Sequence, residues 1–255
     1  MLGLIGVIVG LYFVKDIVSF RVVPQWKVVR QNMSLGIQAM MTDVGVVLGA
    51  WLTTAVLKMY TNDFSQVGYL SRALVLALVV TLMFESVIQL LYASWSKVEG
   101  EVRKISVEKT LNFVFLISIV VSICVFFFSK MLVLLLFGEM FLPAVTATKI
   151  IVVGACFLNI VRTLDPLFRS NNKAYLSVII IGVGLVVNIS TAIFLTPLFD
   201  ADGSATSLLI SNVLMAVLAL FFASSNYGVS IRRVLIPSPM VIKSVVRQVV
   251  RSRGV

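Results

Sequence analysis

The sequence predicts an all-α fold, a polytopic bundle of transmembrane helices, and three observations support this prediction. Hydrophobic residues make up 60% of the 255 positions and charged residues only 13%, with a mean hydropathy of +1.07. The apolar residues gather in six long stretches, and basic residues cluster in every second connection between them. Soluble domains carry about 45–50% apolar and about 25% charged residues, so the composition argues against an ordinary soluble core.

The six apolar stretches each approach or exceed the ~20 residues that a helix needs to cross ~30 Å of hydrocarbon. We therefore predict six full spans that alternate in direction. In chain order they cover residues 34–58, 67–93, 110–129, 144–161, 174–197 and 205–223.

A seventh apolar segment opens the sequence. Met1–Val14 is followed at once by Lys15 and Asp16, and a helix of that length spans only ~21 Å unless it continues to Phe20. We predict a partial transmembrane helix over residues 1–20. A secretory signal peptide is the competing interpretation, but no basic region precedes the apolar run and no small-residue cleavage site follows it.

Basic residues mark one side of the predicted bundle. With alternating spans, seventeen of the 21 Lys and Arg residues fall on one side, and only Lys58 and Lys130 flank the other. Such a bias marks the cytoplasmic side. We therefore predict a multi-pass protein of the cytoplasmic (inner) membrane with a cytoplasmic C-terminus. The net charge of +10 then reflects topology, and nucleic acid is not an expected partner.

Three cytoplasmic segments complete the predicted organisation. Residues 21–33 interleave charges with apolar pairs, which suits a connector in the membrane interface. Residues 94–109 carry charges of both signs, which suits a solvated helix surface. In the tail, residues 229–255, valines recur at helical spacing opposite basic residues. This pattern predicts an amphipathic helix that lies on anionic membrane lipids.

The residues of most membrane-enzyme chemistries are missing. The sequence has no histidine, and its carboxylates are too scattered for a metal cluster or an acid/base pair. Cys124 and Cys156 lie in different spans, where a thiol usually behaves as a small apolar group. Nucleophile elbows, P-loops and Gly-rich nucleotide motifs are also absent from the sequence. We expect no enzymatic activity, no metal and no cofactor.

Three ionisable residues stand out within the predicted spans, namely Asp43, Arg72 and Glu85. An unpaired charge near the bilayer centre costs about 2.5–3.5 kcal/mol on the insertion scale, so such residues indicate function. Asp43 and Glu85 lie ~12–14 Å deep on consecutive antiparallel helices, and Gln89 extends the polar stripe of Glu85. Such stripes either line a cavity or let helices pack closely, with the carboxylates protonated or hydrogen-bonded.

Arg72 lies six residues from the outer end of its span, ~13 Å in depth from Asp43, so the two are not expected to pair. Arg72 could extend to the interface, stack on Trp51, or line a cavity that receives an anionic head group. Lys149 has the same alternatives, with extension to the interface favoured.

Two later spans carry uncharged polar stripes. Asn188 lies with Gly184 and Thr191 on one span, and serines follow at 204, 207 and 211 on the next. We expect hydrogen bonds between helices to account for these stripes. Asn188 is also a candidate for the wall of a cavity.

Three motifs follow one another along the chain. They are Val67–Ala73; Leu135–Ala144; and Val187–Asn188 with Leu195–Phe199 and Gly203–Thr206. In this order they resemble motifs of polysaccharide flippases of the multidrug/oligosaccharidyl-lipid/polysaccharide exporter superfamily. The first is similar to the opening of the family's eighth helix, the second to its apolar run followed by Phe-Gly, Phe and a small residue, and the third to its Asn helix, Pro break and Gly-small-Ala restart.

The resemblance covers nearly the whole chain but only the C-terminal half of a family member, which has two six-helix lobes. It implies that residues 34–228 form a C-lobe, residues 1–20 the last helix of an N-lobe, and residues 21–33 the linker. The sequence departs from the family at Tyr92–Ser94, where a proline is common, and at Asp200–Asp202, where a Gly-rich turn is usual. These departures bear on the substrate that the resemblance implies more than on the fold that it implies.

The implied function is flipping of an undecaprenyl-diphosphate-linked oligosaccharide across the membrane for cell-surface polysaccharide biosynthesis. Arg72 is then the candidate ligand for the diphosphate, while Asp43 and Glu85 could bind a coupling cation, a proton or sugar hydroxyls. The expected partners are the lipid-linked oligosaccharide, membrane lipids, and a separate N-lobe or a missing N-terminal half. The alternatives are a cation-coupled drug or metabolite antiporter of the same superfamily, and a truncated, non-transporting lobe, suggested by the short first helix.

Overall fold

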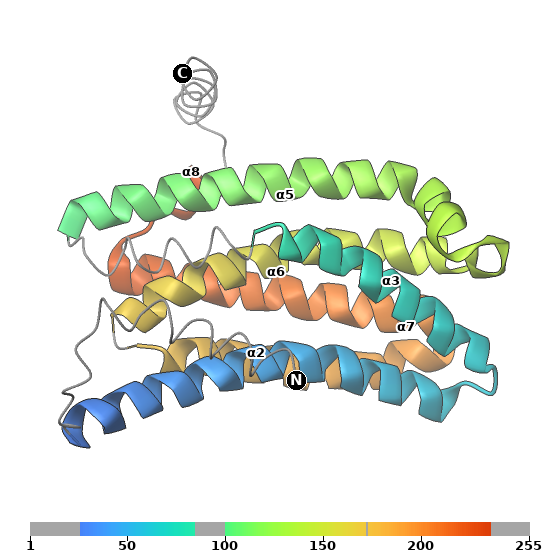
Figure 1. Cartoon of the computed structure of the whole chain (residues 1–255), viewed down its shortest axis with the longest axis horizontal. Helices are drawn as coiled ribbons and strands as arrows, with labels where there is room; N and C mark the ends of the chain where they lie inside the picture. The colour runs from blue at the N-terminus through green and yellow to red at the C-terminus, as the bar shows by residue number, and fades with distance from the viewer. Residues whose placement is uncertain (1–25, 85–99, 172, 236–255) are drawn as a thin grey trace, which may run out of the picture. The chain divides into compact units, whose positions relative to one another are not determined.

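The computed structural model describes residues 26–84, 100–171 and 173–235 (Figure 1). The chain divides into two compact units, residues 1–37 and 38–255. In the first unit the described residues, 26–37, are helical, so the helix begins inside the range 21–33 that the sequence predicts as a connector. The predicted partial helix 1–20 and most of the tail lie outside the described residues.

The described residues form helices and no strands, which confirms the predicted all-α class. Among these residues, five helices are long and apolar enough to cross a membrane, namely α2, α3, α5, α6 and α7. The helices are α2 (Trp26–Tyr60), α3 (Phe64–Leu82), α5 (Gly100–Phe137), the short 3-10 helix η1 (Glu139–Phe141), α6 (Ala144–Ser170), α7 (Tyr175–Tyr227) and α8 (Ile231–Leu235).

The longest helix, α7, folds back on itself at Asp200, whose φ of 48° and ψ of −124° are not helical. The Thr196 and Ser204 hydroxyl oxygens are 3.0 Å apart, although eight residues of straight helix would separate them by ~12 Å. The turn depends on Gly203, because a Cβ there would collide with the Leu195 carbonyl. The predicted spans 174–197 and 205–223 fall on the two antiparallel segments of α7, before and after Asp200.

Local sequence signals set the helix ends. The Asp63 carboxylate accepts a hydrogen bond of 2.9 Å from the Ser65 backbone N–H and caps the start of α3. Gly138 and Gly228, with φ of 86° and 65°, follow α5 and α7 and take backbone conformations that L side chains disfavour. Pro143 directly precedes α6. A residue at a helix start donates no hydrogen bond within the helix, so the absence of an N–H in proline costs nothing there.

Helix α6 is the centre of the second unit and packs against α3, α5 and α7 (Figure 1). In its apolar stretch 61% of residues are buried, compared with 28–33% in the other four long helices. Small side chains permit this approach, since a Cβ on Gly154 would lie 3.3 Å from the Leu209 Cα on α7. The outward faces of the other long helices carry exposed apolar residues such as Phe127 and Phe194, as expected for surfaces that face lipid.

The helices α2, α5 and α6 extend beyond the spans predicted from hydropathy. Helix α2 begins at Trp26 rather than at residue 34, α5 begins at Gly100 rather than at residue 110, and α6 ends at Ser170 rather than at residue 161. Charged residues that the sequence assigns to connectors, among them Arg103 and Arg162, therefore lie on helices. Pairs of opposite charge one turn apart support such extensions, and Arg169 forms an ion pair with Asp165 in this way.

Candidate functional site

A cavity of about 520 Å³ lies between α2, α3, α6 and the second segment of α7. We call it the central cavity. Its wall is mostly apolar and includes the Trp51 ring, and its volume lies within the ~300–1,000 Å³ usual for ligand pockets. The polar groups in the wall are three hydroxyls, an amide and a guanidinium, from Thr54, Ser71, Thr81, Asn212 and Arg162.

The three hydroxyls of the central cavity already donate their protons within their own helices. Thr54 donates to the Ala50 carbonyl at 2.8 Å and Ser71 to the Val67 carbonyl at 2.7 Å. Thr81 donates to the carbonyl of the residue one turn earlier, at 3.3 Å. Each hydroxyl oxygen can still accept a hydrogen bond. The wall thus offers acceptors to a ligand that carries O–H or N–H groups, as a sugar does.

Arg162 is the cation in the wall of the central cavity. It lies eighteen residues after the start of α6, which places it ~27 Å along the helix axis. A guanidinium presents five N–H donors in a planar fork that matches the oxygens of a phosphate. The cavity therefore combines a long apolar wall with one cation near an end, an arrangement suited to an amphipathic anion.

Arg72 lies beside the central cavity rather than in its wall. Its neighbour Ser71 lines the cavity, whereas the Arg72 guanidinium carbon lies 5.2 and 5.3 Å from the ring centroids of Phe137 and Phe141. The arginine thus stacks on rings at the end of α5 and in η1. The sequence proposes Trp51 as an aromatic partner, but the structure supplies these two phenylalanines instead.

Asp43 also lies outside the wall of the central cavity and is exposed. The preceding residue, Thr42, accepts a hydrogen bond of 2.6 Å from the Arg169 guanidinium, which connects α2 to α6. Arg169 also pairs with Asp165, and the Asp43 carboxylate is close enough to repel Asp165. The structure therefore places Asp43 beside a charged cluster near the end of α6.

Asn188 is 1% exposed and joins three helical segments. Its amide nitrogen donates to the Thr53 hydroxyl at 2.8 Å and to the Gly49 carbonyl at 3.1 Å. Its amide oxygen accepts from the Ser207 hydroxyl at 3.2 Å. These contacts, with the 2.8 Å bond from Ser211 to the Gly184 carbonyl, confirm the predicted hydrogen bonds between helices. Since its amide is engaged on both sides, Asn188 acts as a packing residue here.

Two of the sequence-predicted site residues, Glu85 and Gln89, lie outside the described residues. Within the part of the chain that the structure describes, no group of three His, Cys, Asp or Glu residues could hold a metal ion. The buried thiol of Cys156 lies 2.9 Å from the Ser122 hydroxyl and serves the contact between α5 and α6.

Arg162 is not among the site residues predicted from the sequence, because its position after an apolar stretch assigns it to the charges of a cytoplasmic connector. A signal was present: Arg162, Asp165 and Arg169 follow one another at helical spacing directly after an apolar run. Pro166 obscures that signal, because proline usually marks a helix end, yet α6 continues through it.

Comparison of the chain with protein-family models and with curated proteins gives no match. The functional assignment therefore depends on the residues and geometry of the central cavity.

Proposed function

We propose that the protein is a membrane transporter that flips an undecaprenyl-diphosphate-linked oligosaccharide across the cytoplasmic membrane, for cell-surface polysaccharide biosynthesis. The observation that carries this proposal is the central cavity. A lipid-linked diphosphate sugar needs a cation for its phosphates, polar groups for its sugar and an apolar surface for the start of its lipid. Arg162, the three hydroxyls with Asn212, and the apolar wall supply these in one space.

The proposed topology has six spans, with the two segments of α7 crossing the membrane in opposite directions. With six alternating spans, the basic connectors and the basic tail all lie on the predicted cytoplasmic side. An odd number of crossings would place some of these basic segments on the other side. Arg162 then lies at the cytoplasmic end of the central cavity. A diphosphate that arrives from the cytoplasmic leaflet would meet this cation first.

We propose Arg162 as the residue that binds the diphosphate, in place of the sequence candidate Arg72, because of the positions of the two guanidinium groups. Arg162 lines the central cavity, and Arg72 stacks on Phe137 and Phe141. In this proposal Arg72 holds the end of α5 against α3, and its replacement affects transport through packing. Trp51, which lines the cavity and is 73% exposed, marks the wall that a second lobe would cover.

Transport is tested with the Arg162→Ala variant in cells whose own flippase for the same polysaccharide has been removed. We expect surface polymer to fall to the level of the flippase-free cells, with unchanged amounts of protein in the membrane. Arg162→Lys keeps the charge without the fork and should restore part of the polymer. Wild-type polymer from Arg162→Ala would contradict the proposal.

A cation-coupled antiporter is the second candidate, favoured by the carboxylates of Asp43 and Asp165 beside Arg169. Two like charges near one cation could exchange a proton or Na⁺ during transport. Efflux of a small cationic dye from proteoliposomes, driven by an imposed Na⁺ or proton gradient and lost in Asp165→Asn, would favour this function. Gradient-independent flipping of a diphosphate lipid would favour the first.

A further inference from the structure

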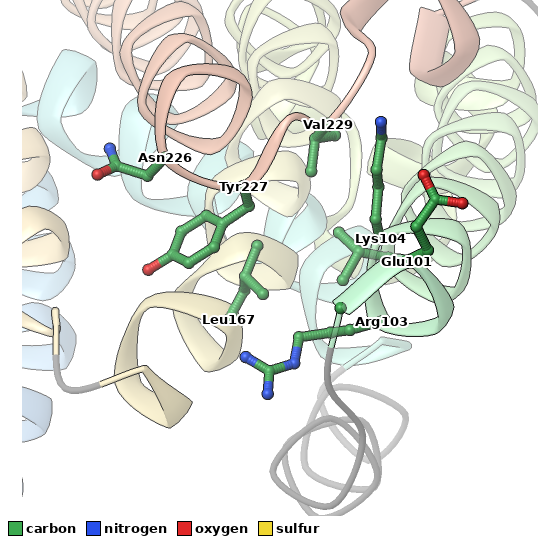
Figure 2. A pocket seen from close by; sticks show the side chains of 9 residues that line it. Glu101, Arg103, Lys104, Leu167, Asn226, Tyr227 and Val229 are labelled. Atoms are coloured by element: carbon green, nitrogen blue, oxygen red, sulfur yellow. The ribbon is translucent and has the colours of Figure 1, made fainter.

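A second pocket, of about 340 Å³, lies where α5 begins and where α6 and α7 end (Figure 2). We call it the end pocket. Arg103 and Lys104 come from the first turns of α5, Leu167 from α6, Asn226 and Tyr227 from the end of α7, and Val229 from the segment that follows. All of these belong to the second unit, and the end pocket shares no lining residue with the central cavity.

Positive charge dominates the end pocket. Arg103 and Lys104 line it together with one carboxylate, Glu101. A third cation, Lys173, lies 5.7 Å from the Tyr227 ring centroid and donates to the Asn226 side-chain oxygen at 2.7 Å. In Figure 2 the Glu101 carboxylate lies on the Lys104 side of the pocket, away from the Arg103 guanidinium. The guanidinium extends toward the side on which Leu167 and Tyr227 lie.

Helix capping explains part of this cluster but not all of it. Arg103 donates to the Asn171 side chain at the end of α6, and Lys173 binds Asn226 at the end of α7. Cations in these places also stabilise the negative ends of helices. However, the bond to Asn226 uses only one of the three donors of the Lys173 ammonium. Lys104 makes no ion pair with any residue of the described chain and reaches the pocket beside Gly228.

We infer that the end pocket binds a phosphate group, through Arg103 and Lys104. An arginine and a lysine on adjacent residues of a helix start can bind a phosphate from two directions, one as a planar fork and one as a point charge. The positive end of the α5 dipole lies beside them, since Gly100 also lines the pocket. Glu101 and the negative end of α7 oppose the anion, so the attraction to Arg103 and Lys104 must exceed this repulsion.

The position of the end pocket indicates where its ligand comes from. On the proposed topology, the beginning of α5 and the ends of α6 and α7 all lie at the cytoplasmic surface. Basic pockets between transmembrane helices on that side suit anionic lipid head groups. A soluble phosphate compound has the same chemistry, and the experiment distinguishes the two sources.

The test is native mass spectrometry of the full chain in detergent with short-chain phosphatidic acid as the probe. We expect one phosphatidic acid to be retained, with affinity about fivefold weaker in Lys104→Gln, since one basic residue near a lipid phosphate contributes about 1 kcal/mol. The double variant Arg103→Gln, Lys104→Gln should weaken it further, and Lys104→Arg should restore it. The matched control is Lys130→Gln, near the other end of the same helix, which should bind as wild type does.

Two competitors separate the sources of the phosphate. Displacement of the lipid by millimolar inorganic phosphate would show that the pocket accepts phosphate itself. Retention of the lipid under these conditions would show that the pocket binds a phosphate only when it is attached to a lipid. Equal binding of uncharged diacylglycerol, or equal weakening in Lys104→Gln and Lys130→Gln, would overturn the inference. Lys104→Gln also keeps the test valid if the double variant fails to fold, because the Lys104 ammonium makes no ion pair within the described residues.

Discussion

The central cavity and the end pocket present different chemical environments within one helical bundle. The central cavity is the larger, at about 520 Å³, and it presents one guanidinium in an apolar wall whose hydroxyl protons are already engaged. The end pocket, at about 340 Å³, concentrates charged side chains at the helix ends. A buried charge is costly in the spans and inexpensive at the interface. Cations can therefore be numerous only where the helices reach water.

The largest effect is expected from Arg162→Ala, which removes the cation of the central cavity and leaves the end pocket intact. Loss of a charge-assisted bond to phosphate is worth about 1.5–3 kcal/mol, or about 10–100-fold. Flipping of a fluorescent diphosphate lipid in proteoliposomes should fall by that factor, while retention of phosphatidic acid stays at the wild-type level. A parallel loss of both would show that the two regions are not independent.

Asn188→Leu should loosen the bundle around the central cavity. The substitution leaves the Thr53 and Ser207 hydroxyls without their amide partner, and hydrogen bonds between membrane helices are worth about 0.6–2 kcal/mol each. We expect the free energy of unfolding in detergent to fall by about 2–3 kcal/mol. Asn226→Leu, which removes a polar group only at the helix end, is the control and should change stability much less.

Glu108→Ala should affect the region close to the end pocket rather than the central cavity. Glu108 is 6% exposed and accepts a hydrogen bond of 2.8 Å from the Ser230 backbone N–H. Its bond to the largely exposed Arg233 is weaker support, at 3.3 Å. We expect a loss of about 1–2 kcal/mol in stability and faster proteolysis within residues 228–235. Transport through the central cavity should be kept if the two regions are independent.

The smallest effect is expected at Asp63, which lines neither the central cavity nor the end pocket. Hydrogen bonds from the Ser65 hydroxyl and backbone N–H lower the pKa of the Asp63 carboxyl below its usual value of 3.8. A lowered pKa in the folded state means that the cap stabilises the fold above the unfolded pKa and is lost as pH falls through the folded one. Melting temperature should decrease slightly below pH 4 in the wild type. Asp63→Asn, which keeps a cap without the charge, should not show this decrease.

The sequence predicted the helical class and the position of most apolar segments, because hydropathy over twenty residues is a local property. It predicted the hydrogen bonds of Asn188 and the serines of α7 for the same reason, since their spacing places them on one face. It could not predict which arginine lines the central cavity. That depends on how α6 packs against α2 and α3 and on the aromatic contacts of Arg72, and both are set by packing between helices distant in sequence.

The sequence also could not reveal the end pocket, whose residues come from positions between 100 and 229. Hydropathy separates spans from connectors but does not say which helix ends meet. In the sequence, the charges of Arg103 and Lys104 indicate only which side of the membrane a connector lies on. Their place in a pocket follows from the start of α5 lying beside the ends of α6 and α7. Charges that look alike in the sequence thus have different surroundings in the structure, and only some of them line a pocket.

The fold-back of α7 at Asp200 has a consequence for how the protein is made. Ser211 donates to the Gly184 carbonyl on the earlier segment, and the Asn188 amide oxygen on that segment accepts from Ser207, so each segment alone would carry a polar side chain into lipid. We therefore expect the translocon to release residues 175–227 as a preformed helical hairpin rather than as two successive helices. A chain arrested before residue 207 should stay cross-linkable to the translocon, whereas one arrested well after residue 227 should not.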